Sequence, residues 1–169
     1  MKTFTRWAIK RDLPAVLEIE GASYTTGTVW TREDFLAVLK CRQCIMIVAE
    51  QGNAVVGFAV YELQQDRLRV LNLAVAPHAR RSGVGAKLLR VVMDKVTTHR
   101  RERLTATIRE TNANAIAFAR ACGLRATGLE RGAFEVEDGY TFTYRPDAET
   151  WAPYGGEPIN RIKQRATAE

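Results

Sequence analysis

Apolar residues recur along the chain with two different periods, which predicts a fold of mixed strands and helices. Short runs that are rich in β-branched residues, or apolar at every second position, predict strands, whereas apolar residues three and four positions apart predict helices. We expect strands at residues 3–9, 45–50, 54–63, 67–75, 104–108, 124–135 and 140–145. We expect helices at residues 12–20, 31–40, 83–96 and 114–122, which gives the order β-α-α-β-β-β-α-β-α-β-β.

Local signals set the ends of several elements. Thr31 and Asp34 have the spacing of a capping box, and Gly123 is placed to end a helix in the left-handed conformation. Residues 137–139 predict the turn of the last hairpin. The helix that Gly83 opens has one apolar face, formed by Val84, Leu88, Val91, Val92 and Val96.

The order of elements predicts the fold class. The strand at 67–75, the helix after it and the strand at 104–108 form a β-α-β unit, which should be a right-handed parallel crossover. We therefore expect an α/β (α+β) fold with a central, mixed, mostly antiparallel twisted sheet flanked by helices.

Composition bounds the class of protein. The chain has 169 residues, of which 46% are hydrophobic and 26% charged, as expected for one domain with a single core. We assign this domain to residues 1–145 and a tail to residues 146–169, partly docked through Trp151 and Tyr154 or disordered. No apolar run approaches the ~20 residues of a membrane span, and the N-terminal segment lacks the apolar stretch of a signal peptide. We expect a cytoplasmic protein without membrane association, either a monomer or a homodimer.

Charge and cysteine content narrow the possible partners. The formal net charge is +6, but no basic run is interleaved with aromatic residues that stack on bases, so we expect no direct nucleic-acid contact. A polyanionic cofactor accounts for the charge equally well. Cys41 and Cys44 have C-x-x-C spacing without a second pair or a nearby histidine, so we expect two free thiols and no metal site.

The most informative segment is the basic turn that follows the strand at 67–75. Gly83 and Gly85 lack Cβ atoms, so an anion can approach the backbone where the helix begins. The unpaired amides and the dipole of a helix N-terminus favour negative charge there, and Arg80 and Arg81 add charge-assisted donors. The alternative interpretation is a plain strand-to-helix turn whose glycines only satisfy backbone angles.

The turn resembles the acetyl-CoA signature of the GNAT superfamily in its pattern Arg80-x-x-Gly83-x-Gly85, which follows residues 71–77. Over residues 4–145 the chain resembles the RimI-type protein N-terminal acetyltransferases, which modify a ribosomal protein alanine. The similarity includes residues 12–20, 30–35, 55–59 and 112–118. It implies the GNAT fold and an acetyl-CoA-dependent N-acetyltransferase.

The resemblance also implies which residues hold acetyl-CoA. Backbone groups of Leu73 and Val75, with Ala74 between them, would pair with the pantetheine arm as an added strand does. Asn112 would hydrogen-bond the cofactor near its acyl end, or would only cap the helix that follows. The pyrophosphate would be held by the turn, which consists of Arg80, Arg81, Ser82, Gly83, Val84, Gly85 and Ala86.

The chain departs from the family at both acid–base positions. The glutamate that serves as general base corresponds to Thr107, and the tyrosine that serves as general acid corresponds to Ala119. Such groups contribute about 10²–10⁴-fold to a rate, so their loss weakens catalysis without forbidding it. An α-amine with a pKa of about 7.7–8.0 is about one-third neutral at pH ~7.5, whereas a lysine with a pKa of about 10.4 is neutral about one time in a thousand. The departure therefore favours an α-amine as acceptor.

Replacement groups would come from the acceptor side of the cleft. We select Tyr140, Tyr24 and Glu135 as catalytic candidates, with Glu20 and Glu137 as further carboxylates. For each of them, a packing or solvated role is the commoner interpretation.

The leading hypothesis is an acetyl-CoA-dependent enzyme that acetylates a primary amine, namely the α-amine at a protein or peptide N-terminus. Two alternatives remain open. One is a small-molecule amine N-acetyltransferase with the same cofactor site, and the other is a non-catalytic acyl-CoA-binding module.

Overall fold

The computed structural model describes residues 1–24 and 29–146 of the chain. These described residues form two compact units, which divide between Val92 and Met93. The order of strands and helices is the one predicted from the sequence. The tail from residue 147 lies outside the described residues, and so does its predicted docking through Trp151 and Tyr154.

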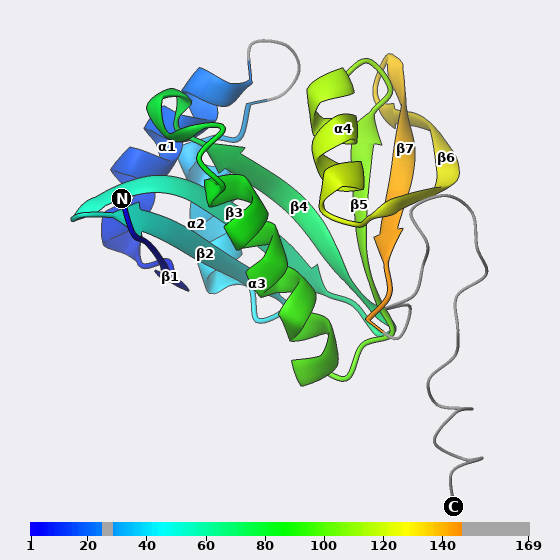
Figure 1. Cartoon of the computed structure of the whole chain (residues 1–169), viewed down its shortest axis with the longest axis horizontal. Coiled ribbons are helices and arrows are strands. Elements are labelled where there is room, and N and C mark those ends of the chain that lie inside the picture. Colours follow the sequence, from blue (N-terminus) through cyan, green and yellow to red (C-terminus); the bar gives the residue numbers. More distant parts are fainter. Residues whose placement is uncertain (25–28, 147–169) are drawn as a thin grey trace, which may run out of the picture. The chain divides into compact units, whose positions relative to one another are not determined.

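Four antiparallel strands form the sheet of the first unit (Figure 1). They follow chain order as β1 (Thr3–Trp7), β2 (Cys44–Gln51), β3 (Ala54–Leu63) and β4 (Arg67–Val75). The predicted bounds of β3 and β4 are confirmed. The turn between β2 and β3 places Gly52 at a φ of +61°, a left-handed conformation that glycine adopts at little cost.

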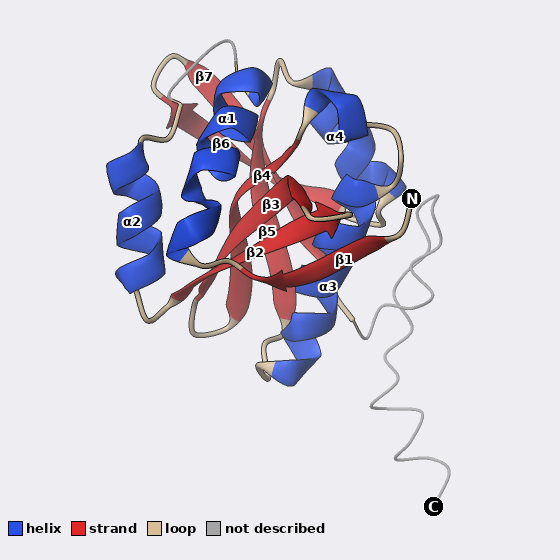
Figure 2. Ribbon diagram, turned by 90° about the vertical axis from the view of Figure 1, so that its left-hand side faces the viewer, coloured by secondary structure: helices blue, strands red, loops and turns tan. Residues whose placement is uncertain are grey.

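Helices α1 (Leu13–Ser23) and α2 (Arg32–Lys40) lie on one face of this sheet (Figure 2). The predicted capping box is confirmed, because the Asp34 amide donates to Thr31 Oγ1 at 3.3 Å and the Thr31 amide donates to Asp34 Oδ2 at 2.7 Å. Phe35 of α2 meets Phe58 of β3 edge-on, with ring centroids 5.4 Å apart. Both rings are fully buried, so they centre the core on this face.

Helix α3 (Val84–Thr98) covers the opposite face at its N-terminal end. Adjacent residues of a strand point to opposite faces, so Gly57 faces away from Phe58 and its neighbour Phe35. A Cβ on Gly57 would lie 3.2 Å from Val84 Cγ1 and 3.1 Å from Leu88 Cδ1, which shows how closely α3 packs there. Of the predicted apolar face of α3, Val84, Leu88, Val92 and Val96 are buried and Val91 is half-buried.

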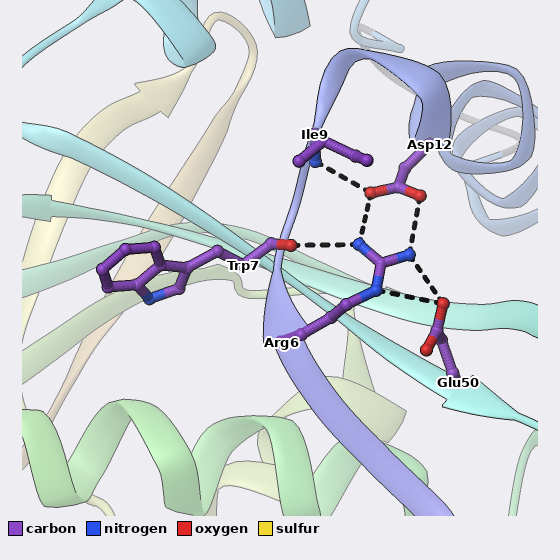
Figure 3. Close-up of polar contacts among 5 residues, drawn as sticks. All are labelled: Arg6, Trp7, Ile9, Asp12 and Glu50. Carbon is purple, nitrogen blue, oxygen red and sulfur yellow. Dashed lines mark hydrogen bonds and ion pairs between the residues drawn. The ribbon is translucent and has the colours of Figure 1, made fainter.

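An ion network fixes the beginning of α1 (Figure 3). The Arg6 guanidinium donates to both carboxylate oxygens of Asp12, at 2.7 and 2.8 Å, and also to Glu50 Oε1 at 2.6 Å. The Ile9 amide donates to Asp12 Oδ2 at 2.8 Å. Hydrogen bonding by Arg6 lowers the pKa of Asp12, so this buried carboxylate is compensated by a cation. Together, these contacts tie β1, β2 and the N-terminal end of α1 to one another.

Three antiparallel strands form the sheet of the second unit, in the order β5 (Arg103–Arg109), β7 (Glu137–Tyr144) and β6 (Arg125–Phe134). Helix α4 (Ala113–Ala121) is capped by Asn112, whose Oδ1 accepts from the Ala115 amide at 3.0 Å. Gly123 follows the helix at a φ of +90°, as predicted. The predicted parallel crossover would join a strand of each unit, and it stays a prediction.

The predicted turn of the last hairpin is wrong. The hairpin turns at Glu135 and Val136, whereas residues 137–139 already belong to β7. Glu135 has a φ of +53°. A Cβ on Gly139 would lie 2.6 Å from Thr107 Cγ2 and 3.0 Å from Ala133 Cβ. Gly139 is therefore required by crowding between strands and not by a turn.

Candidate functional site

The turn between β4 and α3 takes a left-handed path. After a short helical turn at Pro77–Ala79, Arg81 has a φ of +62° and Gly83 a φ of +86°. Ser82 Oγ donates to the Ala79 carbonyl at 2.7 Å, which closes the turn. Among the described residues, no heavy atom outside the chain neighbours of Gly83 would lie within 4 Å of a Cβ placed there. Gly83 is thus required for its backbone angle and leaves space in front of the turn.

Helix α3 directs its N-terminus at this turn. The Gly83 carbonyl accepts the first helical hydrogen bond, from the Lys87 amide at 2.9 Å. The preceding amides of the first helical turn have no carbonyl partner within the helix and carry its positive dipole. Arg81, Ser82 and Gly83 are all exposed, so an anion can reach these amides. The geometry has what a phosphate site needs.

Arg80 serves the fold as well as the turn. Its Nε donates to the Val75 carbonyl at 2.9 Å, and its Nη2 donates to Ser23 Oγ at 3.1 Å and to the Ala22 carbonyl at 3.3 Å. The guanidinium therefore links the end of β4 to the C-terminal end of α1, where a cation also complements the helix dipole. The sequence predicted a donor to phosphate, and the structure adds this positioning role for the side chain.

Two carbonyls of β4 face away from β3. The Ala76 amide donates to the Val56 carbonyl at 2.8 Å, and residues of an antiparallel ladder alternate between their two neighbours. Leu73 and Val75 therefore direct their backbone groups to the other side. The Leu73 carbonyl accepts from the Tyr24 hydroxyl at 3.1 Å, just as the Val75 carbonyl accepts from Arg80. Each of the two carbonyls that we expect to face pantetheine therefore accepts a hydrogen bond from a side chain.

A buried polar network leads to Tyr24. Glu20 is 1% exposed, and its two oxygens accept from the Trp30 amide and from Asn72 Nδ2, both at 3.0 Å. The Tyr24 hydroxyl lies 3.0 Å from Asn72 Oδ1 and 3.1 Å from the Leu73 carbonyl oxygen, so these two acceptors share its single proton. These hydrogen bonds connect α1 to Trp30, just before α2, and to β4. We call Glu20, Asn72 and Tyr24 the Glu20 network.

Burial shifts both titratable groups of the Glu20 network. It raises the pKa of Glu20, against the opposing effect of the hydrogen bonds from Trp30 and Asn72. It also raises the pKa of Tyr24 to about 12, with a further contribution from the charge of Glu20. A hydroxyl with that pKa is a hydrogen-bond donor at neutral pH and a weak acid toward a thiolate whose own pKa is about 8.5. This raised pKa favours a hydrogen-bonding role for Tyr24 over a proton-donating one.

The remaining candidates belong to the second unit. Tyr140 lies on β7 opposite Ile108 and is 37% exposed, and Glu135 is exposed at the hairpin turn. Asn112 uses its side-chain oxygen for the helix cap, as the alternative interpretation predicted. Ala119 is buried in α4. Tyr24 lies in the first unit and Tyr140 and Glu135 lie in the second, so neither unit contains all three candidates.

One carboxylate was missed by the sequence analysis. Thr107 Oγ1 on β5 donates to Glu130 Oε2 on β6 at 3.3 Å. Glu130 pairs with Gly139 on the intervening strand β7. Because Gly139 has no side chain, the Thr107 side chain can lie over β7, where a Cβ on Gly139 would be only 2.6 Å from Thr107 Cγ2. The register of β6 shifts on both sides of Glu130, so no spacing in the sequence indicates this contact.

Neither a metal-binding cluster nor a membrane-spanning helix occurs within residues 1–24 and 29–146. No group of three or more His, Cys, Asp and Glu side chains that could hold a metal ion occurs in that part of the chain. No helix there is long and apolar enough to cross a membrane.

Comparison with known proteins identifies related sequences and folds. The model of the acetyltransferase (GNAT) family matches residues 13–124. The chain is 27% identical over 128 residues to the [ribosomal protein bS18]-alanine N-acetyltransferase of Escherichia coli (strain K12), which covers 76% of this chain and 84% of that protein. The corresponding enzyme of Salmonella typhimurium (strain LT2) is 25% identical over 129 residues, covering 76% of this chain and 85% of that protein.

Solved structures share the fold at lower identity. The ribosomal-protein-S18-alanine N-acetyltransferase from Escherichia coli has a TM-score of 0.76 at 22% identity, covering 85% of this chain and 94% of that chain. Ard1 from Thermoplasma volcanium has a TM-score of 0.77 at 22% identity, with 86% and 98% covered. A putative acetyltransferase from Salmonella typhimurium, solved with its cofactor acetyl-CoA, has a TM-score of 0.71 at 20% identity, with 87% and 95% covered.

The turn at Gly83 yields a prediction for acetyl-CoA binding. Gly83→Glu places a side chain and a negative charge in front of the amides of α3, so calorimetry should show acetyl-CoA affinity at least about tenfold weaker. Gly52→Glu is the matched control, because Gly52 is also left-handed with no atom near its missing Cβ. Equal affinity in a folded Gly83→Glu protein would mean that the cofactor binds elsewhere.

The Glu20 network yields a prediction for stability against pH. Because its folded-state pKa is raised, the neutral acid stabilises the fold fully below the unfolded pKa of about 4.3, and this contribution is lost as pH rises through the folded pKa. In Glu20→Gln, a flipped Asn72 amide can rebuild the same chain of hydrogen bonds without a charge. The variant should therefore gain unfolding free energy relative to the native protein as pH rises from about 4 to 7.

Denaturant unfolding at several pH values measures this difference, with the exposed Glu18→Gln on the same helix as control. A constant difference between the native protein and Glu20→Gln would show that Glu20 has an ordinary pKa in the fold.

Proposed function

The chain belongs to the acetyltransferase (GNAT) family, and from that membership we propose that it acetylates the α-amine at a protein or peptide N-terminus. The resemblance inferred from the turn at Arg80–Gly85 is confirmed, and so are the acetyltransferase class and acetyl-CoA as co-substrate. The acceptor, the site residues and the role of the tail are proposals.

The similarity to bacterial ribosomal-protein alanine N-acetyltransferases carries the choice of acceptor. It extends over 84% of the Escherichia coli protein and therefore includes the segments on both sides of the cofactor turn. The chemistry points the same way, because a chain with Thr107 and Ala119 at the acid–base positions gains most from an amine that is already partly neutral. A small-molecule amine and a purely acyl-CoA-binding role are the alternatives.

We assign acetyl-CoA to the exposed face of the β4–α3 turn. The amides that open α3 would hold the pyrophosphate, and the outward edge of β4 at Leu73 and Val75 would hold pantetheine. Support comes from the left-handed turn at Arg81 and Gly83 and from the direction of the β4 carbonyls. The Tyr24 hydroxyl would then lie near the acyl end of the cofactor, since it already donates to the Leu73 carbonyl.

Glu130 is our proposed replacement for the family's glutamate. The resemblance assigns the general base to position 107, and the Glu130 carboxylate lies 3.3 Å from the Thr107 hydroxyl. As the amine forms its bond to the acetyl carbon, the carbon–sulfur bond breaks, coenzyme A leaves as a thiolate, and the proton of the amine passes to the carboxylate. Thr107 would orient Glu130 for this transfer.

Acceptor preference tests the proposed function. Release of free coenzyme A should be at least about tenfold faster with peptides that begin with a free alanine than with the same peptides blocked at the α-amine but carrying a lysine. Polyamines and amino acids should react more slowly than the free peptides. Tight acetyl-CoA binding without turnover on any amine would support the binding module, and preference for a small amine would support the other alternative.

The role of Glu130 is tested by a charge-neutral variant. Glu130→Gln should lower kcat by about 10²-fold while leaving acetyl-CoA affinity unchanged, because it removes only a proton acceptor. Glu135→Gln is the matched control and tests the earlier candidate. In both, the rise of kcat/KM with pH should follow the pKa of the acceptor amine, near 8 for an α-amine. Full activity in Glu130→Gln would point to another base. So would a kcat/KM that stops rising at a pH well below the pKa of the acceptor amine.

A further inference from the structure

The acyl-transfer site leaves the C-x-x-C turn between α2 and β2 unused. Cys41 follows the last residue of α2, and Cys44 is the first residue of β2. The Cys44 amide donates to the Cys41 carbonyl at 3.3 Å, which makes residues 41–44 a hydrogen-bonded β-turn. Cys41 is exposed and Cys44 is half-buried.

The turn brings the two thiols within bonding range. Residues i and i+3 of a β-turn have Cα atoms within ~7 Å, and disulfides span Cα distances of about 4.4–6.8 Å. The Cα separation within this turn is therefore compatible with a disulfide between Cys41 and Cys44.

The two thiols have unequal surroundings. The Cys44 thiol and the Gln43 amide donate to Cys41 and lower the pKa of its thiol. Burial, followed by the bond to Cys41, raises the pKa of Cys44 to about 12, and Glu62 on β3 acts in the same direction on both thiols. The outer thiol is thus the nucleophile and the inner thiol stays protonated until it is needed.

We propose that Cys41 and Cys44 form a reversible dithiol–disulfide site that reacts with low-molecular-weight disulfides. The Cys41 thiolate attacks one sulfur of the reagent, its S–S bond breaks, and one thiolate leaves with the electron pair. Cys44 then gives its proton to solvent and attacks Cys41 Sγ, which releases the second thiolate and closes the Cys41–Cys44 bond. The protein loses two electrons and the reagent gains them.

A metal site does not account for this pair equally well. Two thiolates supply half of a tetrahedral zinc shell, and within the described part of the chain no third ligand completes a group around them. The turn is also separate in sequence from the cofactor turn at residues 80–85, so this inference does not depend on the proposed function.

Oxidised glutathione is the probe for the experiment, applied to the full chain and followed by intact mass. The native protein should end two hydrogens lighter, without a bound glutathione. Cys44→Ser should stop at the mixed disulfide, one glutathione heavier, because Cys44 is the resolving thiol. Cys41→Ser should react at least about tenfold more slowly than Cys44→Ser at pH 7. Equal rates in the two variants would overturn the assignment of the nucleophile.

Peptide mapping provides a readout on the native protein alone. Trypsin cleaves after Lys40 and Arg42, so only a Cys41–Cys44 disulfide joins the dipeptide 41–42 to the peptide that begins at Gln43. Recovery of the joined peptide after oxidation, and its loss on reduction, is expected. A native protein that keeps a stable glutathione adduct, links Cys122 instead, or takes up zinc in place of oxidation would overturn the proposal.

Discussion

The buried carboxylate of Glu20 is the constraint on which the candidate site depends. Both of its hydrogen-bond partners are uncharged, so hydrogen bonds and not a cation compensate the charge in a low-dielectric setting. In return, Glu20 fixes the Asn72 amide, and Asn72 fixes the Tyr24 hydroxyl on the Leu73 carbonyl. Losing one partner would leave the others buried and unpaired, which is the expensive outcome for such groups. The outward edge of β4 is therefore ordered by α1 before any cofactor binds.

Different interactions stabilise the two ends of α1. At the N-terminal end, the Arg6 guanidinium neutralises Asp12 and Glu50, so the charges there are paired. At the C-terminal end, Arg80 binds the Ala22 carbonyl and the Ser23 hydroxyl while the Glu20 network reaches β4. The first arrangement secures the helix to the sheet. The second connects it to the cofactor turn and the β4 edge, and only this end combines structural contacts with groups assigned to chemistry.

Local sequence signals predicted the strands and helices well, but they did not predict contacts between residues that are distant in the sequence. Strands β3 and β4 had their predicted bounds because apolar runs end at clear turn residues there. The turn of the last hairpin was predicted wrongly, because a glycine at position 139 is locally typical of a turn. In the structure, Gly139 lies in a strand, where a Cβ would clash with the Thr107 side chain of another strand. The cofactor turn was visible as a contiguous motif. The Glu20–Asn72 bond joins residues 52 positions apart, and the Thr107–Glu130 contact crosses a strand with shifted register, so neither leaves a local signal.

The proposed chemistry follows from what the described side chains can and cannot transfer. A tyrosine with a pKa of about 12 holds its proton more tightly than coenzyme A needs, since a thiol of pKa ~8.5 leaves readily as the thiolate. The acid is thus the more dispensable of the family's two groups. The base matters in proportion to the charge on the amine, and an α-amine is neutral several hundred times more often than a lysine at pH ~7.5. The proposed base, the Glu130 carboxylate of β6, therefore suits an N-terminal amine better than a lysine side chain, which at this pH is almost always in its unreactive, protonated form.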